Sequence, residues 1–122
     1  MAVYAENAQT LLYFWKSLIG GDCMSKLENK FQSDLKKELK ERFPDCIVTK
    51  LDANDIQGIP DLLVLYKNKW ATLECKKSEK ARQQPNQPYY VEKMNDMSFS
   101  RFIYPENKDD VLDELEKKFK RR

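Results

Sequence analysis

Three residues in the middle of the chain are of the types that carry out metal-assisted hydrolysis. Asp61 stands at the start of one apolar stretch, and Glu74 and Lys76 stand two positions apart in the next. Residues two apart on a strand share a face, so Glu74 and Lys76 would point the same way and Cys75 the other way. Magnesium takes one or two carboxylates and leaves its other positions to water and phosphate oxygens. The acids could therefore hold a metal, while the lysine orients or deprotonates a water or stabilises transition-state charge.

Two short strands must position these groups. The run Leu62–Leu65 is apolar at every position, which predicts a central strand buried on both faces. Lys67-Asn68-Lys69 predicts a tight hairpin that would bring the two acids together. The alternative is that Glu74 and Lys76 form a solvated ion pair on one face of a strand, contributing less than about 1 kcal/mol.

The order Pro60-Asp61 followed by Glu74-Cys75-Lys76 resembles the motif of the PD-(D/E)xK nuclease superfamily. Gln84-Pro85-Asn86-Gln87 resembles the helix start of its VRR-NUC (virus-type replication-repair nuclease) family, whose glutamine matches Gln87. The resemblance covers most of the chain, from about residue 25 to residue 120. It implies an α/β, restriction-endonuclease-like fold, in which a mixed β-sheet is flanked by helices in the order helix, three strands, helix, strand, helix.

The resemblance also implies an activity and a site. The activity is hydrolysis of DNA phosphodiester bonds by a metal-dependent endonuclease that uses Mg²⁺ or Mn²⁺. Asp61, Glu74 and the backbone carbonyl of Cys75 would hold the metal. Lys76 and Gln87 would complete the catalytic set.

The first helix is expected from about residue 25 to residue 42, ended by Pro44. Its predicted apolar stripe repeats every four residues: Leu27, Phe31, Leu35, Leu39 and Phe43. Related nucleases carry an acid from this helix into the metal site, which makes Glu28 a further candidate ligand. Ser25 and Glu28 also have the form of a capping box, which explains Glu28 without a function.

The remaining elements are strands over about residues 45–51 and 99–104, a helix from Pro88 to about Met97, and a last helix capped by Asn107. On the middle helix, Tyr89 or Tyr90 could stack on a base, although a tyrosine in an amphipathic helix is more often a core residue.

Basic residues cluster after the predicted site. Lys77, Lys80 and Arg82 are expected to contact nucleic acid, because cations beside a carboxylate site offset its repulsion of phosphates. The net charge of +2 is too small to indicate nucleic-acid binding by itself. The basic run at residues 117–122 has a second interpretation as a solvated surface.

The composition limits the other possibilities. A chain of 122 residues is long enough for one domain, which we place at residues 24–122, after an N-terminal extension at 1–23 that could precede a true start at Met24. No stretch is long and apolar enough for a membrane span. The absence of histidine excludes Ser-His-Asp, Cys-His and histidine-dependent metal catalysis. Three widely spaced cysteines indicate no disulfide framework and fit the reducing cytoplasm of a bacterial or phage-infected cell.

We therefore expect a structure-selective endonuclease that acts on branched DNA such as a Holliday junction. A homodimer is expected, because two nicks on opposed strands require two sites. The alternative is a non-catalytic nucleic-acid-binding module on the same fold. A sequence-specific restriction-type nuclease is the third hypothesis, and it would be expected to carry a larger recognition insertion. A phage or prophage origin would suit the family.

Overall fold

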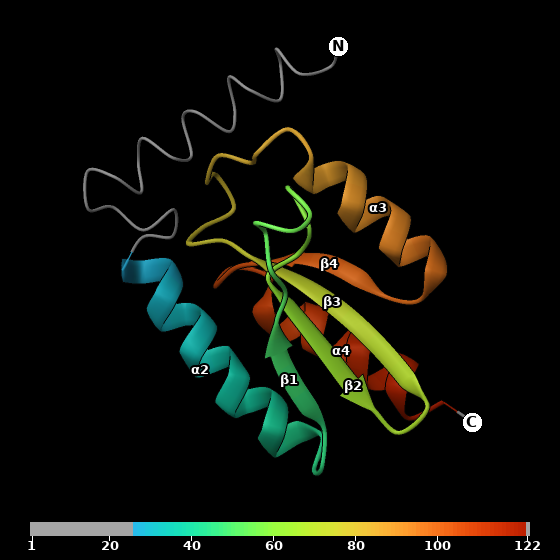
Figure 1. Cartoon of the computed structure of the whole chain (residues 1–122). Helices are drawn as coiled ribbons and strands as arrows, with labels where there is room; N and C mark the ends of the chain where they lie inside the picture. Colours follow the sequence, from blue (N-terminus) through green and yellow to red (C-terminus); the bar gives the residue numbers. More distant parts are fainter. Residues whose placement is uncertain (1–25, 122) are drawn as a thin grey trace.

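The computed structural model describes residues 26–121, and these form a mixed four-stranded sheet with helices on both faces (Figure 1). The predicted order of helix, three strands, helix, strand and helix is confirmed. In chain order the elements are α2 (Lys26–Arg42), β1 (Ile47–Lys50), β2 (Leu62–Tyr66), β3 (Lys69–Cys75), α3 (Gln87–Met97), β4 (Ser100–Ile103) and α4 (Lys108–Phe119). The extension at 1–23, the proposed start at Met24 and the capping residue Ser25 lie outside the described residues.

The sheet has the strand order β1-β2-β3-β4. The first three strands form an antiparallel meander, and β4 joins the far side of β3 in parallel. The hairpin predicted between β2 and β3 is present, and Lys67 in its turn has a φ of 56°. Positive φ matches the right-handed twist of the flanking strands, so this short turn keeps β2 and β3 in register.

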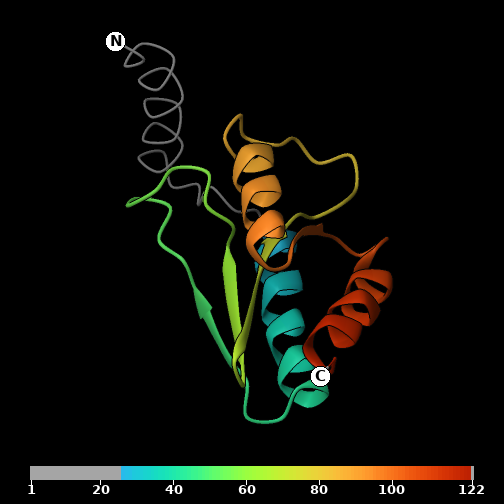
Figure 2. The same ribbon diagram turned by 90° about the vertical axis from the view of Figure 1, so that its right-hand side faces the viewer.

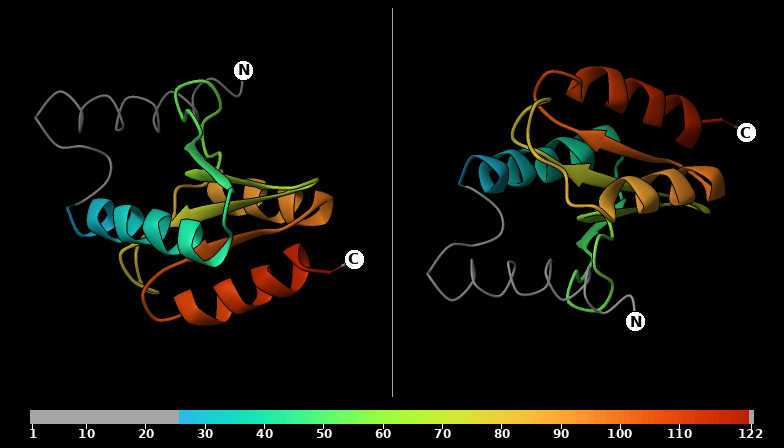
Figure 3. Two further views of the ribbon diagram at one scale, coloured as in Figure 1. Left: turned by 90° about the horizontal axis from the view of Figure 1, so that it is seen from below. Right: turned by 90° about the horizontal axis from the view of Figure 1, so that it is seen from above.

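The core lies on one face of the sheet, beneath α2 and α4. Ala71, Leu73 and Cys75 of β3 point into a cluster with Leu39 of α2 and Leu112 of α4. Viewed from below and from above, α2 and α4 lie on one side of the sheet and α3 on the other (Figure 3). The alternation of β3 therefore separates an apolar face from the face that carries Glu74 and Lys76.

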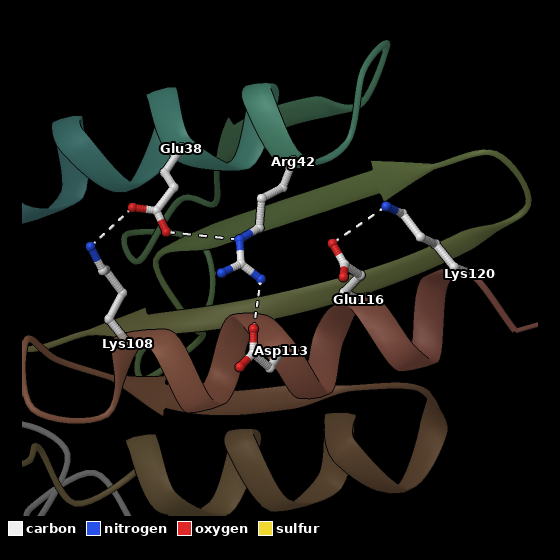
Figure 4. Close-up of polar contacts among 6 residues, drawn as sticks. All are labelled: Glu38, Arg42, Lys108, Asp113, Glu116 and Lys120. Atoms are coloured by element: carbon white, nitrogen blue, oxygen red, sulfur yellow. Dashed lines mark hydrogen bonds and ion pairs between the residues drawn. The ribbon is translucent and has the colours of Figure 1, made fainter.

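The helices α2 and α4 also lie side by side (Figure 2), and charged side chains join them (Figure 4). Lys108 pairs with Glu38 at 2.9 Å, and Arg42 pairs with Asp113 at 3.0 Å. These pairs are partly exposed, so they add little stability to the apolar contact beneath them.

Two details of the predicted burial are wrong. Leu27 is exposed, and the buried positions of α2 are Gln32, Leu35 and Leu39, with Phe43 following the helix. A helix turns once in 3.6 residues, so a strict four-residue repeat advances about 40° too far at each step and leaves the core face. The strand β2 is not buried on both faces, because Leu65 is 38% exposed. The helix α3 contacts β3 and β4, so the part of the same sheet face that β1 and β2 form stays open.

None of the helices described between residues 26 and 121 has the length and apolar character needed to cross a bilayer.

Candidate active site

The antiparallel register of β2 and β3 brings Asp61 beside the end of β3. Leu62 pairs with Leu73, so Asp61, the residue before β2, lies beside Glu74 and Cys75, the two residues after Leu73. Asp61 Oδ2 accepts a hydrogen bond of 2.9 Å from the backbone N–H of Cys75. The backbone of Asp61 is also fixed, because its carbonyl accepts a 2.9 Å bond from the N–H of Leu51. The two predicted acids therefore meet at one end of the sheet.

Glu74 is held in an enclosed position on the α3 face. Its side chain is 2% exposed, and Oε2 accepts a 2.9 Å hydrogen bond from Gln87 Nε2. Lys76 Nζ lies 3.7 Å from the same oxygen. Oε1 is buried and receives no hydrogen bond. Because an unpaired buried carboxylate oxygen is costly, this atom is a strong candidate to bind a cation or a proton.

The protonation of the two acids reflects that enclosure. Burial raises the pKa of Glu74 to about 9, and the adjacent Asp61 adds to the increase while Lys76 opposes it. Burial also raises the pKa of Asp61, an effect that the Cys75 N–H partly offsets. A protonated Glu74 can share its proton with Asp61 through a hydrogen bond between the carboxyl groups. In the absence of a cation, the pair therefore retains a proton at neutral pH.

Gln87 connects the lysine to the glutamate. Its Oε1 accepts hydrogen bonds from Lys76 Nζ at 2.7 Å and from the backbone N–H of Gln84 at 2.9 Å. Its Nε2 donates to Glu74. Lys76 Nζ donates a further bond of 3.3 Å to the carbonyl of Arg82. The Gln87 amide thus fixes the positions of both neighbours, and the lysine is only 7% exposed.

A glycine brings a distant loop against the start of α3. Gly58 has a φ of +91°, and a Cβ built on it would lie 2.4 Å from Cβ of Asn86 and 2.8 Å from its carbonyl carbon. Asn86 immediately precedes Gln87 at the N-terminus of α3. The loop before Asp61 therefore packs directly against the backbone that carries Gln87. Only glycine accommodates both this backbone conformation and this contact without strain.

Glu28 also reaches this end of the sheet. Its Oε1 accepts a hydrogen bond of 3.4 Å from the N–H of Lys77, and its charge contributes to the raised pKa of both Asp61 and Glu74. The side chain thus contacts the segment that follows β3. The capping-box explanation involves Ser25, which lies outside the described residues.

Gln32 is a polar residue near the site that the sequence interpretation did not include. It is buried one turn after Glu28, and its side chain lies by the Cys75 thiol, while its Nε2 has no hydrogen-bond partner. The spacing of Glu28, Gln32, Leu35 and Leu39 was the available signal, because these residues share one helix face.

The donor set fits a hard divalent cation. Among the described residues, no group of three or more acid, cysteine or histidine side chains forms a ready metal cluster. Mg²⁺ and Mn²⁺ do not require one, since two carboxylates can suffice beside water and phosphate. A residue in an extended strand directs its N–H and C=O to the same side, and the Cys75 N–H faces Asp61. The Cys75 carbonyl therefore points to the side of β3 where Asp61 lies, as an additional oxygen ligand would.

The remaining predicted residues surround this site at the surface. Lys77, Lys80 and Arg82 are exposed on the segment after β3. Tyr90 is half-buried and Tyr89 is exposed, so the core interpretation is wrong for Tyr89. Asn107 precedes α4, but its side chain makes no capping bond to that helix.

Comparison with known proteins gives one informative result. A solved structure titled "VRR_NUC domain" superposes with a TM-score of 0.54 and 26% sequence identity, over 73% of this chain and 97% of that chain. No family model and no curated protein matches the chain. The similarity extends over nearly the whole of the matched domain, and it supports the family resemblance of the motifs around Asp61 and Gln87.

Proposed function

We propose that the chain, which resembles a solved VRR_NUC domain over 97% of that domain, is a metal-dependent endonuclease that hydrolyses phosphodiester bonds in DNA. The observation that carries this proposal is the pair of adjacent carboxylates, the half-buried Asp61 and the buried Glu74, with the unpartnered Oε1 of Glu74. The cost of leaving this oxygen unpaired would be offset by a cation bound between the acids.

Asp61, Glu74 and the Cys75 carbonyl would hold Mg²⁺ or Mn²⁺, and Glu28, whose charge helps to raise the pKa of both acids, would join them or bind a coordinated water. A bound divalent ion supplies Lewis acidity to a phosphate oxygen and lowers the pKa of a coordinated water. The chain itself contributes the deprotonated Glu74, which must release its proton for a cation to bind.

Lys76 is the group that would act on the attacking water or the phosphate. Its amine is held by Gln87 Oε1 and the Arg82 carbonyl, both within 3.3 Å, so it reaches the site in a fixed orientation. An ammonium there stabilises negative charge on the phosphate in the transition state, while a neutral amine would take a proton from water. Both roles require the positioning that Gln87 provides.

The exposed cations next to the site suit a phosphate backbone. Lys77, Lys80 and Arg82 follow the catalytic strand directly, so a strand crossing the site would pass over them. Their contribution should appear as affinity that falls steeply with salt. We extend the proposal to branched substrates, including four-way junctions, and to a homodimer that presents two sites to one junction.

Cleavage assays on a panel of DNA structures test this function. The full chain would be incubated with Mg²⁺, Mn²⁺ or a chelator on linear duplex, single-stranded, flap and four-way-junction DNA of matched sequence. Metal-dependent nicking that is fastest on a branched substrate is expected. Asp61→Ala and Glu74→Ala should abolish it while leaving DNA binding intact. Tight binding without cleavage under every metal condition would favour the alternative of a non-catalytic nucleic-acid-binding module.

A further inference from the structure

A buried amide on α2 has an unmet hydrogen bond. Gln32 is 2% exposed, and its Nε2 meets no acceptor among the residues that the structure describes. A buried N–H without an acceptor costs free energy that an apolar side chain of the same size would avoid. The other buried residues of the helix, Leu35 and Leu39, are apolar, so packing alone does not require an amide at this position.

The amide lies where the candidate metal ligands converge. Gln32 is close to the thiol of Cys75, on the side of β3 that α2 contacts. The pKa of that thiol is raised by burial and then by the charges of three carboxylates, those of Asp61, Glu74 and Glu28. The carbonyl of the same cysteine is the candidate backbone ligand. Gln32 therefore borders the site from the α2 side of the sheet.

Gln32 also stands one helical turn after Glu28. Residues four apart on a helix are neighbours on one face, and the side chain at the later position leans over the earlier turn. The Gln32 amide therefore leans toward the Glu28 carboxylate, whose Oε1 accepts a hydrogen bond of 3.4 Å from the N–H of Lys77. Carboxylates that bind a cation are held by such donors, which fix their orientation and tune their basicity.

We infer that Gln32 is a positioning residue, which donates a hydrogen bond from Nε2 to the Glu28 carboxylate when that carboxylate turns to a divalent cation. The inference rests on the metal site of the proposed function, and it adds a residue that acts on the cation only through Glu28. Without the cation, the buried amide should lower the stability of the fold. With the cation, the same amide should strengthen binding.

Calorimetry and urea denaturation of the full chain, in the absence of DNA, test this role. Gln32→Met keeps the length of the side chain and removes the donor. It should weaken Mn²⁺ binding by about 10- to 100-fold, the range for losing a hydrogen-bond partner of a metal ligand. In a chelator, the midpoint of urea unfolding should rise by about 0.5 M or more, because the unmet donor is gone.

Two controls separate positioning from packing. Leu35→Met, at the next buried position of α2, should leave Mn²⁺ affinity unchanged. Glu28→Ala should itself weaken Mn²⁺ binding. Adding Gln32→Met to Glu28→Ala should then cause no further loss, because the amide has no carboxylate left to orient.

A lower urea midpoint for Gln32→Met would identify the amide as an ordinary structural residue and overturn the inference. Unchanged Mn²⁺ affinity, or the same loss of affinity in the Glu28→Ala background, would also overturn it. Mn²⁺ affinity that survives Asp61→Ala would instead reject the metal site of the proposed function. A loss in Asp61→Ala with no loss in Gln32→Met would reject the role of Gln32 alone, so the two proposals can fail separately.

Discussion

Glu74 is a carboxyl group in a position where its charged form is poorly solvated. Its side chain is almost fully buried, its neighbours include a second carboxylate, and one of its oxygens lacks a donor. The free-energy cost of keeping a charged carboxylate buried is typical of functional sites, where a bound ligand can offset it. The same cost makes the stability of the metal-free protein depend on pH.

In the presence of a chelator, stability should fall as pH rises toward 9. The pKa of Glu74 lies near 9 in the folded protein and near 4.5 in the unfolded chain. Between pH 4.5 and pH 9 the folded state therefore binds one proton more than the unfolded state. The free energy of unfolding then decreases by up to about 1.4 kcal/mol per pH unit, and levels off above the folded pKa. Urea denaturation at pH 6 and pH 8.5 measures the change.

Glu74→Gln should remove most of this pH dependence and should stabilise the metal-free protein at pH 8.5. Glu92→Gln, an exposed glutamate on α3, is the matched control and should behave like the wild type. Mn²⁺ should stabilise the wild type but not Glu74→Gln, because a ligand that binds only the folded state raises its stability. The same pH slope in both Glu variants would refute the assignment of the effect to Glu74.

Lys76→Ala should reduce the rate of cleavage at saturating DNA and metal by about 10²-fold or more, since the group is positioned for proton transfer or charge stabilisation. Its affinity for Mn²⁺, measured by calorimetry, should change little. Lys117→Ala, an exposed lysine on α4, is the control for loss of a positive charge. If calorimetry shows that Lys76→Ala loses metal affinity alone, the assigned role is wrong.

At the scale of elements, the site depends on how the loop before β2 meets the start of α3. Gly58 and Asn86 are far apart in the sequence, and their backbones are in direct contact. Gln87 follows Asn86 and bonds to both Glu74 and Lys76. A displacement of this contact would therefore be transmitted to the hydrogen bonds of the candidate site.

Gly58→Ala should lower the rate of cleavage more than the loss of stability explains. The new methyl group would strain the positive φ, at a cost of about 1 kcal/mol or more, and would push against Asn86. Steady-state cleavage rates and urea denaturation of the same preparations measure the two effects. Asn86→Gly, combined with Gly58→Ala, removes the nearest clashing atom and should recover part of the activity. A rate that follows stability alone would exclude this positioning role.

For the whole molecule, the sheet face that carries Glu74 is only partly covered. Over β3 and β4 it is covered by α3, while Ile47 and Leu65, which are paired across β1 and β2, remain exposed. Met97, at the end of α3, is also exposed. Trp70 and Phe102 are both half-buried. An open apolar face of this kind suits association with another surface.

We predict a homodimer that buries the paired residues Ile47 and Leu65. Light scattering at micromolar concentration, with and without junction DNA, should give the dimer mass. Leu65→Glu should give a monomer, since it places a charge in the open apolar face. Glu92→Gln on α3 should leave the dimer intact. A monomer in both conditions that cuts flaps faster than junctions would indicate a flap or repair nuclease instead.

Removal of residues 1–23 is predicted to leave a stable and active protein. Every described element and every candidate site residue lies at Lys26 or later, so the truncated chain retains the core under α2 and α4. Thermal melting and the cleavage assay compare the two forms. A large fall in melting temperature would show that residues 1–23 contribute to the stability of the fold.

Local pattern alone predicted the first helix, the hairpin at Lys67 and the shared face of Glu74 and Lys76. Each depends on backbone geometry with a short period, which neighbouring residues specify. The resemblance of the motifs around Asp61 and Gln87 implied the order of elements, and the solved structure that the chain resembles carries the same family name. Burial could not be obtained in this way, because it depends on which surfaces meet after the chain has folded. The exposure of Leu27 and Tyr89 and the open face at Leu65 follow from where the helices pack.

The contacts that define the site were likewise decided by tertiary structure. No local pattern indicates that Gly58 touches Asn86, that Gln87 bridges Glu74 and Lys76, or that one oxygen of Glu74 is left without a donor. These contacts join segments separated along the chain, and their energies arise from burial in a shared low-dielectric region. The sequence by itself determined which groups are available for chemistry, and the packing of three separate segments decided the charge and position in which they are held.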